Sequence, residues 1–211
     1  MAGALTALLA VTGCGGATPA QAPVSNLTVH DDDGMYGAVL TDPYRLPDAT
    51  LTDTSGRPYA LREDTTKPLT LVFFGYTHCP DVCQVVMASI ASAVNRLDPA
   101  DRDDVGMLFV TSDPARDDAA TLRSYLDRFD PTFEGLTGDL GDIVKVANAL
   151  GVPVEKGAKM PSGGYEVAHG AQIVGVESDG TAPIVWTEGT AAQKFAADIT
   201  TLLHDQTGSD S

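Results

Sequence analysis

The chain is poor in basic residues and in cysteine, and it lacks several common catalytic motifs. Of its 211 residues, 13 are Lys or Arg and 29 are Asp or Glu, so the formal net charge is −16 at pH 7. A general nucleic-acid-binding protein needs a basic surface, and this composition excludes that class. No nucleotide-binding glycine pattern, hydrolase serine motif or zinc-protease motif is present in the sequence. The acidic excess favours a soluble protein that anionic surfaces repel.

The chain has only three cysteines, and two of them are four residues apart. Cys79 and Cys83 follow the apolar run of residues 69–75 (LTLVFFG), where a strand is expected to pass into a helix. On a helix, positions i and i+4 lie on the same face. Their Cα atoms are about 6 Å apart, which is within the range that a disulfide spans. Two sulfurs placed in this way can bind one soft metal ion or close a disulfide, and the spacing leaves both alternatives open.

The third cysteine, Cys14, ends a short apolar stretch. Residues 1–13 (MAGALTALLAVTG) are too few to span a bilayer as a helix and are typical of the end of a signal peptide. Residues 11–14 (VTGC) resemble the bacterial lipobox, although no Lys or Arg precedes the apolar run. We expect a signal peptide over residues 1–13, a lipidated Cys14, and a flexible tether over residues 14–35. Such a protein would be lipid-anchored at the cell membrane on its extracytoplasmic face. The alternative is an unprocessed apolar tail with an unpaired thiol.

Residues 36–205 are predicted to form one folded domain, and residues 206–211 a disordered tail. The continuous apolar runs at 69–76 and 105–111 predict central strands that are buried on both faces. Helices and strands alternate along the chain, which indicates a mixed α/β sheet. A cysteine pair at a strand-to-helix junction then favours a thioredoxin-like fold, with helices flanking the sheet and an N-terminal strand or hairpin extension. The helices are expected over residues 82–97, 118–129, 139–150 and 190–204. The shorter strands are expected over residues 44–47 and 51–59, with a Ser-Gly turn, and over residues 133–138, 167–177 and 182–186.

Four blocks of the sequence occur in an order that is specific to one known family. They are residues 74–83 (FGYTHCPDVC), 111–117 (TSDPARD), 135–138 (GLTG) and 165–169 (YEVAH). Together they closely resemble the signature of the Sco/SenC family, copper proteins that assist the assembly of cytochrome c oxidase. The resemblance covers roughly residues 36–203, which is nearly the whole predicted domain. A C-x-x-x-C motif alone would be weak evidence, whereas four ordered blocks and a lipobox together are specific.

The resemblance implies that one copper ion, Cu(I) or Cu(II), is bound per chain by Cys79, Cys83 and His169. Cu(I) is soft and prefers thiolate ligands, and a site with two thiolates and one imidazole stays open to an acceptor's ligands. The thiols must lose their protons to bind the metal. The positive end of the following helix is expected to help by stabilising thiolate. Asp81 and Asp113 are candidates for contacts that tune the ligands, and Asp113 is equally explained as a turn residue.

The sequence departs from the family pattern at two places. Gln84 follows the second cysteine where the family often has proline, and His169 is flanked by Ala and Gly where many members have Asp and Ser. Neither change removes a ligand, but the second alters the hydrogen bonding that orients the imidazole. His78 neighbours Cys79 in the sequence, and the resemblance assigns it no ligand role.

Three classes of function fit these residues. The first is a membrane-tethered metallochaperone that delivers copper to the binuclear copper site of cytochrome c oxidase or to another copper protein. The second is a thiol–disulfide oxidoreductase that reduces the acceptor's cysteines, forms a Cys79–Cys83 disulfide when oxidised, and needs a thiol reductant as partner. The third is a redox or copper sensor, or a peroxide-reducing enzyme. The C-x-x-x-C spacing disfavours a general oxidoreductase, and the block around His169 disfavours a peroxidase. We therefore expect a chaperone rather than an enzyme, with thiol reduction as an accompanying or alternative activity.

Overall fold

The computed structural model describes residues 34–80, 82–159 and 165–208. Within these residues, eight strands form one mixed sheet in the order β1-β10-β9-β4-β5-β6-β2-β3, and β7 and β8 form a separate ribbon. The strands are β1 (Ala38–Arg45), β2 (Thr50–Asp53), β3 (Pro58–Ala60), β4 (Leu69–Gly75), β5 (Val105–Thr111), β6 (Glu134–Thr137), β7 (Val154–Lys159), β8 (Tyr165–His169), β9 (Ile173–Glu177) and β10 (Thr181–Trp186). The helices are α1 (Leu61–Asp64), α2 (Val82–Val94), α3 (Pro99–Asp103), α4 (Ala119–Leu126), α5 (Leu140–Ala149) and α6 (Ala192–Gly208).

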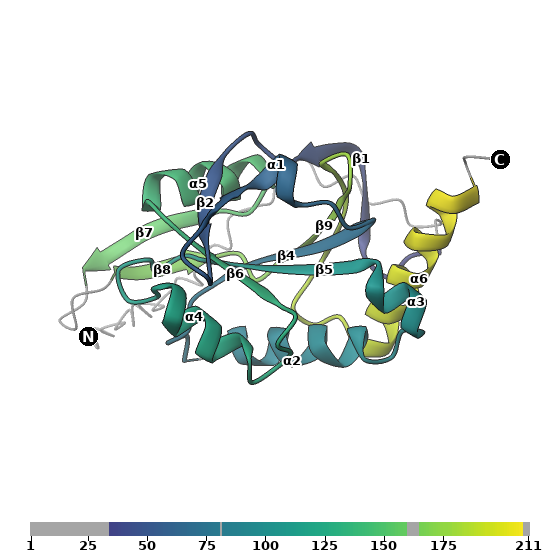
Figure 1. Cartoon of the computed structure of the whole chain (residues 1–211). Helices are drawn as coiled ribbons and strands as arrows, with labels where there is room; N and C mark the ends of the chain where they lie inside the picture. The colour runs from purple at the N-terminus through teal and green to yellow at the C-terminus, as the bar shows by residue number, and fades with distance from the viewer. Residues whose placement is uncertain (1–33, 81, 160–164, 209–211) are drawn as a thin grey trace, which may run out of the picture.

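The sheet is covered on both faces by helices. Figure 1 shows α1 and α5 on one side of the sheet, and α2, α4 and α6 on the other. Because side chains alternate along a strand, Leu71 and Phe73 of β4 belong to the cluster with α2 and α6, whereas Val72 and Phe74 belong to the cluster with α5. Burial on both faces explains why the sequence of this strand is a continuous apolar run. The predicted mixed α/β sheet with flanking helices is confirmed.

The expected N-terminal extension occupies both edges of the sheet. Strand β1 pairs antiparallel with β10 at one edge, and β2 pairs with both β3 and β6 near the other. The stretch 51–59, where short strands and a Ser-Gly turn were expected, is a hairpin that turns at Gly56, whose φ of +78° favours glycine. The Asp53 carboxylate accepts hydrogen bonds from the backbone N–H of Ser55 and Arg57, both at 2.8 Å, and so closes the turn.

The prediction of one strand over residues 167–177 is wrong. The structure divides this stretch into β8, which pairs with β7 in the ribbon, and β9, which pairs with β4 in the main sheet. At the break, the Gly170 N–H donates to the carbonyl of Pro153 at 3.1 Å. The sequence has no strong turn signal between the two strands, so its apolar pattern predicts one continuous strand. The ribbon strand β7 was not anticipated.

Two helix boundaries also differ from expectation. Helix α2 ends at Val94, and Pro99 begins the short helix α3 instead of only ending α2. Proline is well tolerated at the first position of a helix, because its missing N–H would have no partner there. Helix α6 continues to Gly208, so the predicted tail of residues 206–211 is helical in its first part.

The predicted signal peptide and lipidated Cys14 lie outside the described residues, as does nearly all of the tether. Met35 already packs against the core, so the folded part starts slightly earlier than residue 36. None of the helices in residues 34–80, 82–159 and 165–208 is long and apolar enough to cross a membrane.

Candidate metal and thiol site

The two cysteines lie on the connection between β4 and α2. Residues 76–80, here called the cysteine loop, leave the end of β4, and the Cys79 N–H donates to the Tyr76 carbonyl at 3.1 Å. Cys83 lies in the first turn of α2. The expectation that both cysteines share one helical face is therefore wrong, because Cys79 precedes the helix. Pro80 explains this, since the residue before a proline is disfavoured in the α conformation.

The two thiols are buried and share a hydrogen bond. Cys79 is 7% exposed and Cys83 is fully buried within the core cluster that contains Val86 and Met87. Burial raises the pKa of Cys83, and a hydrogen bond with the Cys79 thiol raises it further, while nearby backbone groups oppose the shift. The expected stabilisation of thiolate by the helix is outweighed at Cys83, because the cost of burying a charge is larger.

Asp117 holds the cysteine loop against the end of β5. Its side chain is fully buried, and it accepts hydrogen bonds from the Thr77 N–H at 2.9 Å, the Thr77 hydroxyl at 2.6 Å and the Thr111 hydroxyl at 2.7 Å. The His78 side chain is 59% exposed, and its Nδ1 lies 3.7 Å from the Asp117 carboxylate. The Asp117 carboxylate thus fixes the residues that directly precede Cys79. Sequence reasoning did not single out Asp117, although this residue ends the TSDPARD block.

Asp113 shapes the turn that follows β5. It is 3% exposed, its carbonyl accepts from the N–H of Arg116 and Asp117, and its carboxylate pairs with the Arg116 side chain. The Arg116 guanidinium lies 5.8 Å from the centre of the Tyr76 ring, and Tyr76 belongs to the cysteine loop. This geometry agrees with a turn residue that acts on the site through Arg116. A direct role of Asp113 in tuning the ligands stays a prediction.

Two tyrosines that the sequence did not reveal flank the cysteine pair. Burial raises the pKa of Tyr76, and the charges of Cys79 and Cys83 raise it further. Burial also raises the pKa of Tyr125, with Cys83 as the next contribution. Tyr125 packs its ring on Phe109, with 5.4 Å between ring centres. Only the fold brings Tyr125 to the cysteines, because it comes from α4, more than 40 residues along the chain.

The strand register brings His169 and the cysteine loop to the same end of the sheet. Ile173 of β9 pairs with Phe73 of the antiparallel strand β4. The chain just before Ile173 and the chain just after Phe73 therefore leave the sheet at the same end. In Figure 1 this is the left end, where α4 and the β7–β8 ribbon lie. His169 is the last residue of β8, and its backbone pairs with Val154.

The described side chains supply two of the three predicted metal ligands. The side chain of His169 lies outside the described part of the structure, as do Asp81 and Cys14. Among the residues that are described, no group of three or more His, Cys, Asp and Glu side chains could hold a metal ion. The thiols of Cys79 and Cys83 suit a soft ion such as Cu(I), which prefers sulfur and needs few ligands. The same two thiols could also be oxidised to a disulfide.

Comparison with known proteins identifies relatives along most of the chain. Residues 44–204 match the SCO1/SenC family. The human mitochondrial SCO1 homolog is 31% identical over 132 residues, which are 62% of this chain and 44% of the human protein. Three other curated relatives are covered over 66%, 40% and 37% of their lengths, so the chain spans less than two thirds of these proteins.

Solved structures of related proteins share the fold. The apo Sco1 protein of Thermus thermophilus has a TM-score of 0.71 and 30% identity, with 80% of this chain and 96% of that chain covered. ScoI of Bradyrhizobium japonicum, solved with copper bound, has a TM-score of 0.64 and 34% identity, with 76% of this chain and 98% of that chain covered. The predicted thioredoxin-like fold is confirmed by these neighbours. The match over residues 44–204 includes Cys79, Cys83 and His169, and the chain belongs to the SCO1/SenC family.

Proposed function

We propose that this chain is a membrane-tethered copper chaperone that acts outside the cytoplasm. Its acceptor would be the binuclear copper site of cytochrome c oxidase or another copper protein. The observation that carries the proposal is the pair of buried, hydrogen-bonded thiols at the end of β4 in a member of the SCO1/SenC family. The copper bound to the Bradyrhizobium japonicum relative supports the choice of metal.

In this proposal Cys79 and Cys83 donate two thiolates, and His169 supplies an imidazole. Because burial raises the pKa of Cys83, that thiol is protonated at neutral pH, and copper must displace its proton on binding. Cys79 is slightly exposed and Cys83 is not, so an acceptor's ligands would reach the metal from the side of Cys79. Asp81, between the cysteines, and Asp113, through Arg116, remain candidates for tuning the ligands.

A competitive Cu(I) titration of the reduced full chain tests the ligand set. We expect one tightly bound copper per chain, loss of binding in Cys79→Ser, and at least about tenfold weaker binding in His169→Ala. His204→Ala is the matched control, because His204 is exposed on α6 and hydrogen bonds with Asp101 at 3.1 Å. Absence of tight binding in the wild type would contradict the proposal. Unchanged affinity in His169→Ala would remove the third ligand.

A thiol–disulfide oxidoreductase is the second candidate, and one observation favours it. The two thiols already share a hydrogen bond, so a Cys79–Cys83 disulfide needs little movement of the chain. The pair would lose two electrons and two protons to the acceptor's disulfide, and a separate thiol reductant would restore it. This activity should persist in His169→Ala and be lost in Cys83→Ser. Copper binding, in contrast, should be weakened by both substitutions.

The membrane anchor of the proposal rests on Cys14 and the lipobox-like residues 11–14. Lipidated Cys14 would hold the domain at the cell membrane through the tether. We expect the wild-type chain in the membrane fraction and Cys14→Ser in the soluble fraction. Equal partition of the two variants would contradict the anchor without affecting the copper site.

A further inference from the structure

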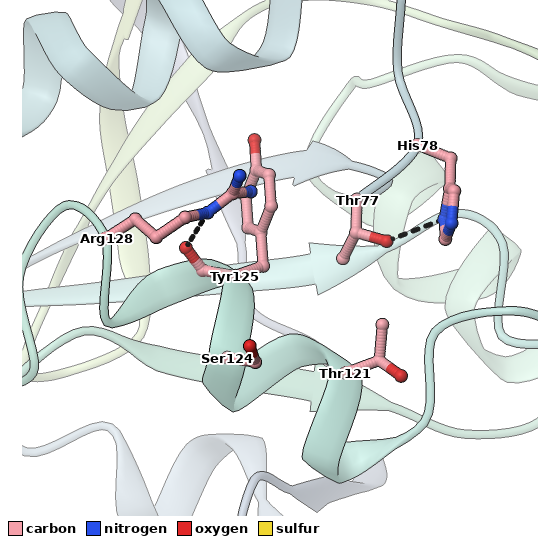
Figure 2. Close-up of a pocket in the computed structure, with 6 residues that line it drawn as sticks. All are labelled: Thr77, His78, Thr121, Ser124, Tyr125 and Arg128. Carbon is pink, nitrogen blue, oxygen red and sulfur yellow. Dashed lines mark hydrogen bonds between the residues drawn. The ribbon is translucent and has the colours of Figure 1, made fainter.

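A polar hollow of approximately 260 Å³ lies beside the cysteine loop. Figure 2 shows that its lining side chains come from two segments, the cysteine loop and the region of α4. Two of the lining residues, Thr77 and His78, directly precede Cys79. A group bound in this hollow would therefore contact the loop that carries the proposed copper ligand. The complete lining is Thr77, His78, Thr121, Ser124, Tyr125 and Arg128.

Arg128 contributes a guanidinium group to the lining of the hollow. Its guanidinium lies 4.6 Å from the centre of the Tyr125 ring, and its Nε donates to the Tyr125 carbonyl at 3.2 Å. The ion pairs formed within the described residues do not include Arg128. Arg116 and Arg123, in contrast, each pair with an aspartate a few residues away. An exposed arginine outside the ion pairs of the described residues is notable in a chain whose net charge is −16.

Tyr125 is the one buried residue among those that line the hollow. The residue is 3% exposed, and its hydroxyl has no hydrogen-bond partner within the described part of the chain. A buried phenol usually has such a partner, because an unpaired polar group in the interior is costly. Tyr125 lines the hollow together with the hydroxyl-bearing residues Thr121 and Ser124. The lining thus combines a guanidinium with several hydrogen-bond donors.

We propose that this hollow receives a carboxylate side chain of the protein that exchanges copper with Cys79 and Cys83. A guanidinium binds a carboxylate through two parallel hydrogen bonds, and hydroxyl groups can donate further ones. Because the chain is otherwise strongly acidic, it repels an acidic partner over most of its surface. Arg128 then selects one orientation, in which the partner's acidic residue lies beside the copper ligands. The identity of this partner as a copper acceptor rests on the function proposed above.

The first test measures docking without copper. The probe is a twelve-residue peptide with two cysteines and two flanking glutamates, and its twin carries glutamines instead. In amide NMR spectra of the reduced, metal-free full chain, we expect the glutamate peptide to shift Thr77, Thr121 and Ser124. Arg128→Glu should abolish these shifts, and Arg128→Lys should retain them in part. Arg96→Glu is the matched control, because Arg96 is exposed just beyond α2 and the charge change is the same.

The second test measures copper transfer from the loaded chain to the same peptides. Arg128→Glu should slow transfer to the glutamate peptide about tenfold, and Arg96→Glu less than about twofold. Equal effects of the two variants, or equal binding of the two peptides, would overturn the proposed docking site. Because the NMR test contains no copper, failure of the Cu(I) titration would overturn the proposed function alone. The shifts at Thr77, Thr121 and Ser124 would still decide the docking proposal.

Discussion

Two buried aspartates, Asp198 and Asp117, hold segments of the chain together at opposite ends of the molecule. Only Asp117 lies near the thiols. Asp198, which is 2% exposed, accepts hydrogen bonds from the N–H of Tyr36 and Gly37 and from Nε1 of Trp186. Asp117, which is fully buried, accepts from the cysteine loop and from Thr111. In Figure 1, α6 with Asp198 lies to the right of the sheet, and the start of α4, just after Asp117, lies to the left.

A buried carboxylate group serves a different purpose at each of these two places. In both places a buried carboxylate satisfies several donors that would otherwise be unpaired in the interior. Asp198 attaches the N-terminal segment to α6 and β10, so we expect it to contribute to stability and not to copper binding. Asp117 instead fixes Thr77, two residues before Cys79. Substitutions at the two positions should therefore separate stability from copper binding.

Asp198→Ala should have the largest effect on stability. It leaves the N–H groups of Tyr36 and Gly37 and Nε1 of Trp186 without their acceptor, so we expect a loss of about 3 to 5 kcal/mol in the free energy of unfolding. Urea denaturation measures this loss. Cu(I) affinity of the folded chain should stay unchanged. Asp205→Ala, at an exposed position of the same helix, is the control. Weaker copper binding in Asp198→Ala would break the proposed separation.

Asp117→Ala should lower both stability and affinity. Loss of the acceptor for Thr77 and Thr111 should cost about 2 to 4 kcal/mol, and the loosened cysteine loop should reduce Cu(I) affinity about tenfold. Urea denaturation and competitive Cu(I) titration give the two numbers. Asp142→Ala is the control, because Asp142 pairs with Lys145 on the exposed side of α5. A destabilised variant with wild-type affinity would show that the loop does not depend on Asp117.

The reduced, metal-free chain should lose stability at alkaline pH. Burial raises the pKa of Cys83, so above about pH 8.5 the unfolded chain releases this proton before the folded chain does. The unfolded state then binds fewer protons, and stability falls as pH rises, by at most about 1.4 kcal/mol per pH unit. Urea midpoints between pH 7 and pH 10 measure the slope. Cys83→Ala should show a shallower slope, and identical slopes would refute the assignment to this thiol.

Asp118→Ala should have the smallest effect. Asp118 is the N-cap of α4, and its carboxylate accepts from the Thr121 N–H at 2.8 Å, a bond that also holds the pKa of Asp118 below its usual range. Loss of this cap should destabilise the chain only slightly, and Asp118→Asn should restore most of the lost stability. Thermal or urea denaturation of the three proteins measures the difference. A loss as large as that of Asp117→Ala would mean that α4 depends on its first turn more than the hydrogen bonds suggest.

Parts of the fold could be predicted because their signals are local. Strands β4 and β5 were expected almost within their observed bounds, since each is a continuous apolar run with polar or turn residues around it. Helix α5 was expected to end before Gly151, whose φ is +68°. The separation of β8 from β9 was missed, because hydrophobic pattern does not tell which partner strand a segment pairs with.

The residues of the candidate site also divide into those that the sequence predicted and those that only the fold revealed. Cys79, Cys83 and His169 were predicted as ligands from the resemblance, and this ligand set stays a prediction. Asp117 and Tyr125 were not singled out, although both contact or flank the cysteine region. Asp117 was quoted only as the end of the TSDPARD block, and Tyr125 lies in none of the four blocks. Their roles depend on the packing of α4 and β5 against the cysteine loop.

The sequence by itself limited the Cys79–Cys83 pair to two uses, binding a soft metal ion or closing a disulfide, because of the C-x-x-x-C spacing. It also determined the central strands, because a strand that is buried on both faces has a continuous run of apolar side chains. Only the tertiary structure decided that Cys83 is fully buried, which raises the pKa of its thiol. It alone placed Arg128 in the hollow beside the cysteine loop. The physical reason is that burial, hydrogen bonding and charge at a site depend on residues that are distant in sequence and adjacent only after folding.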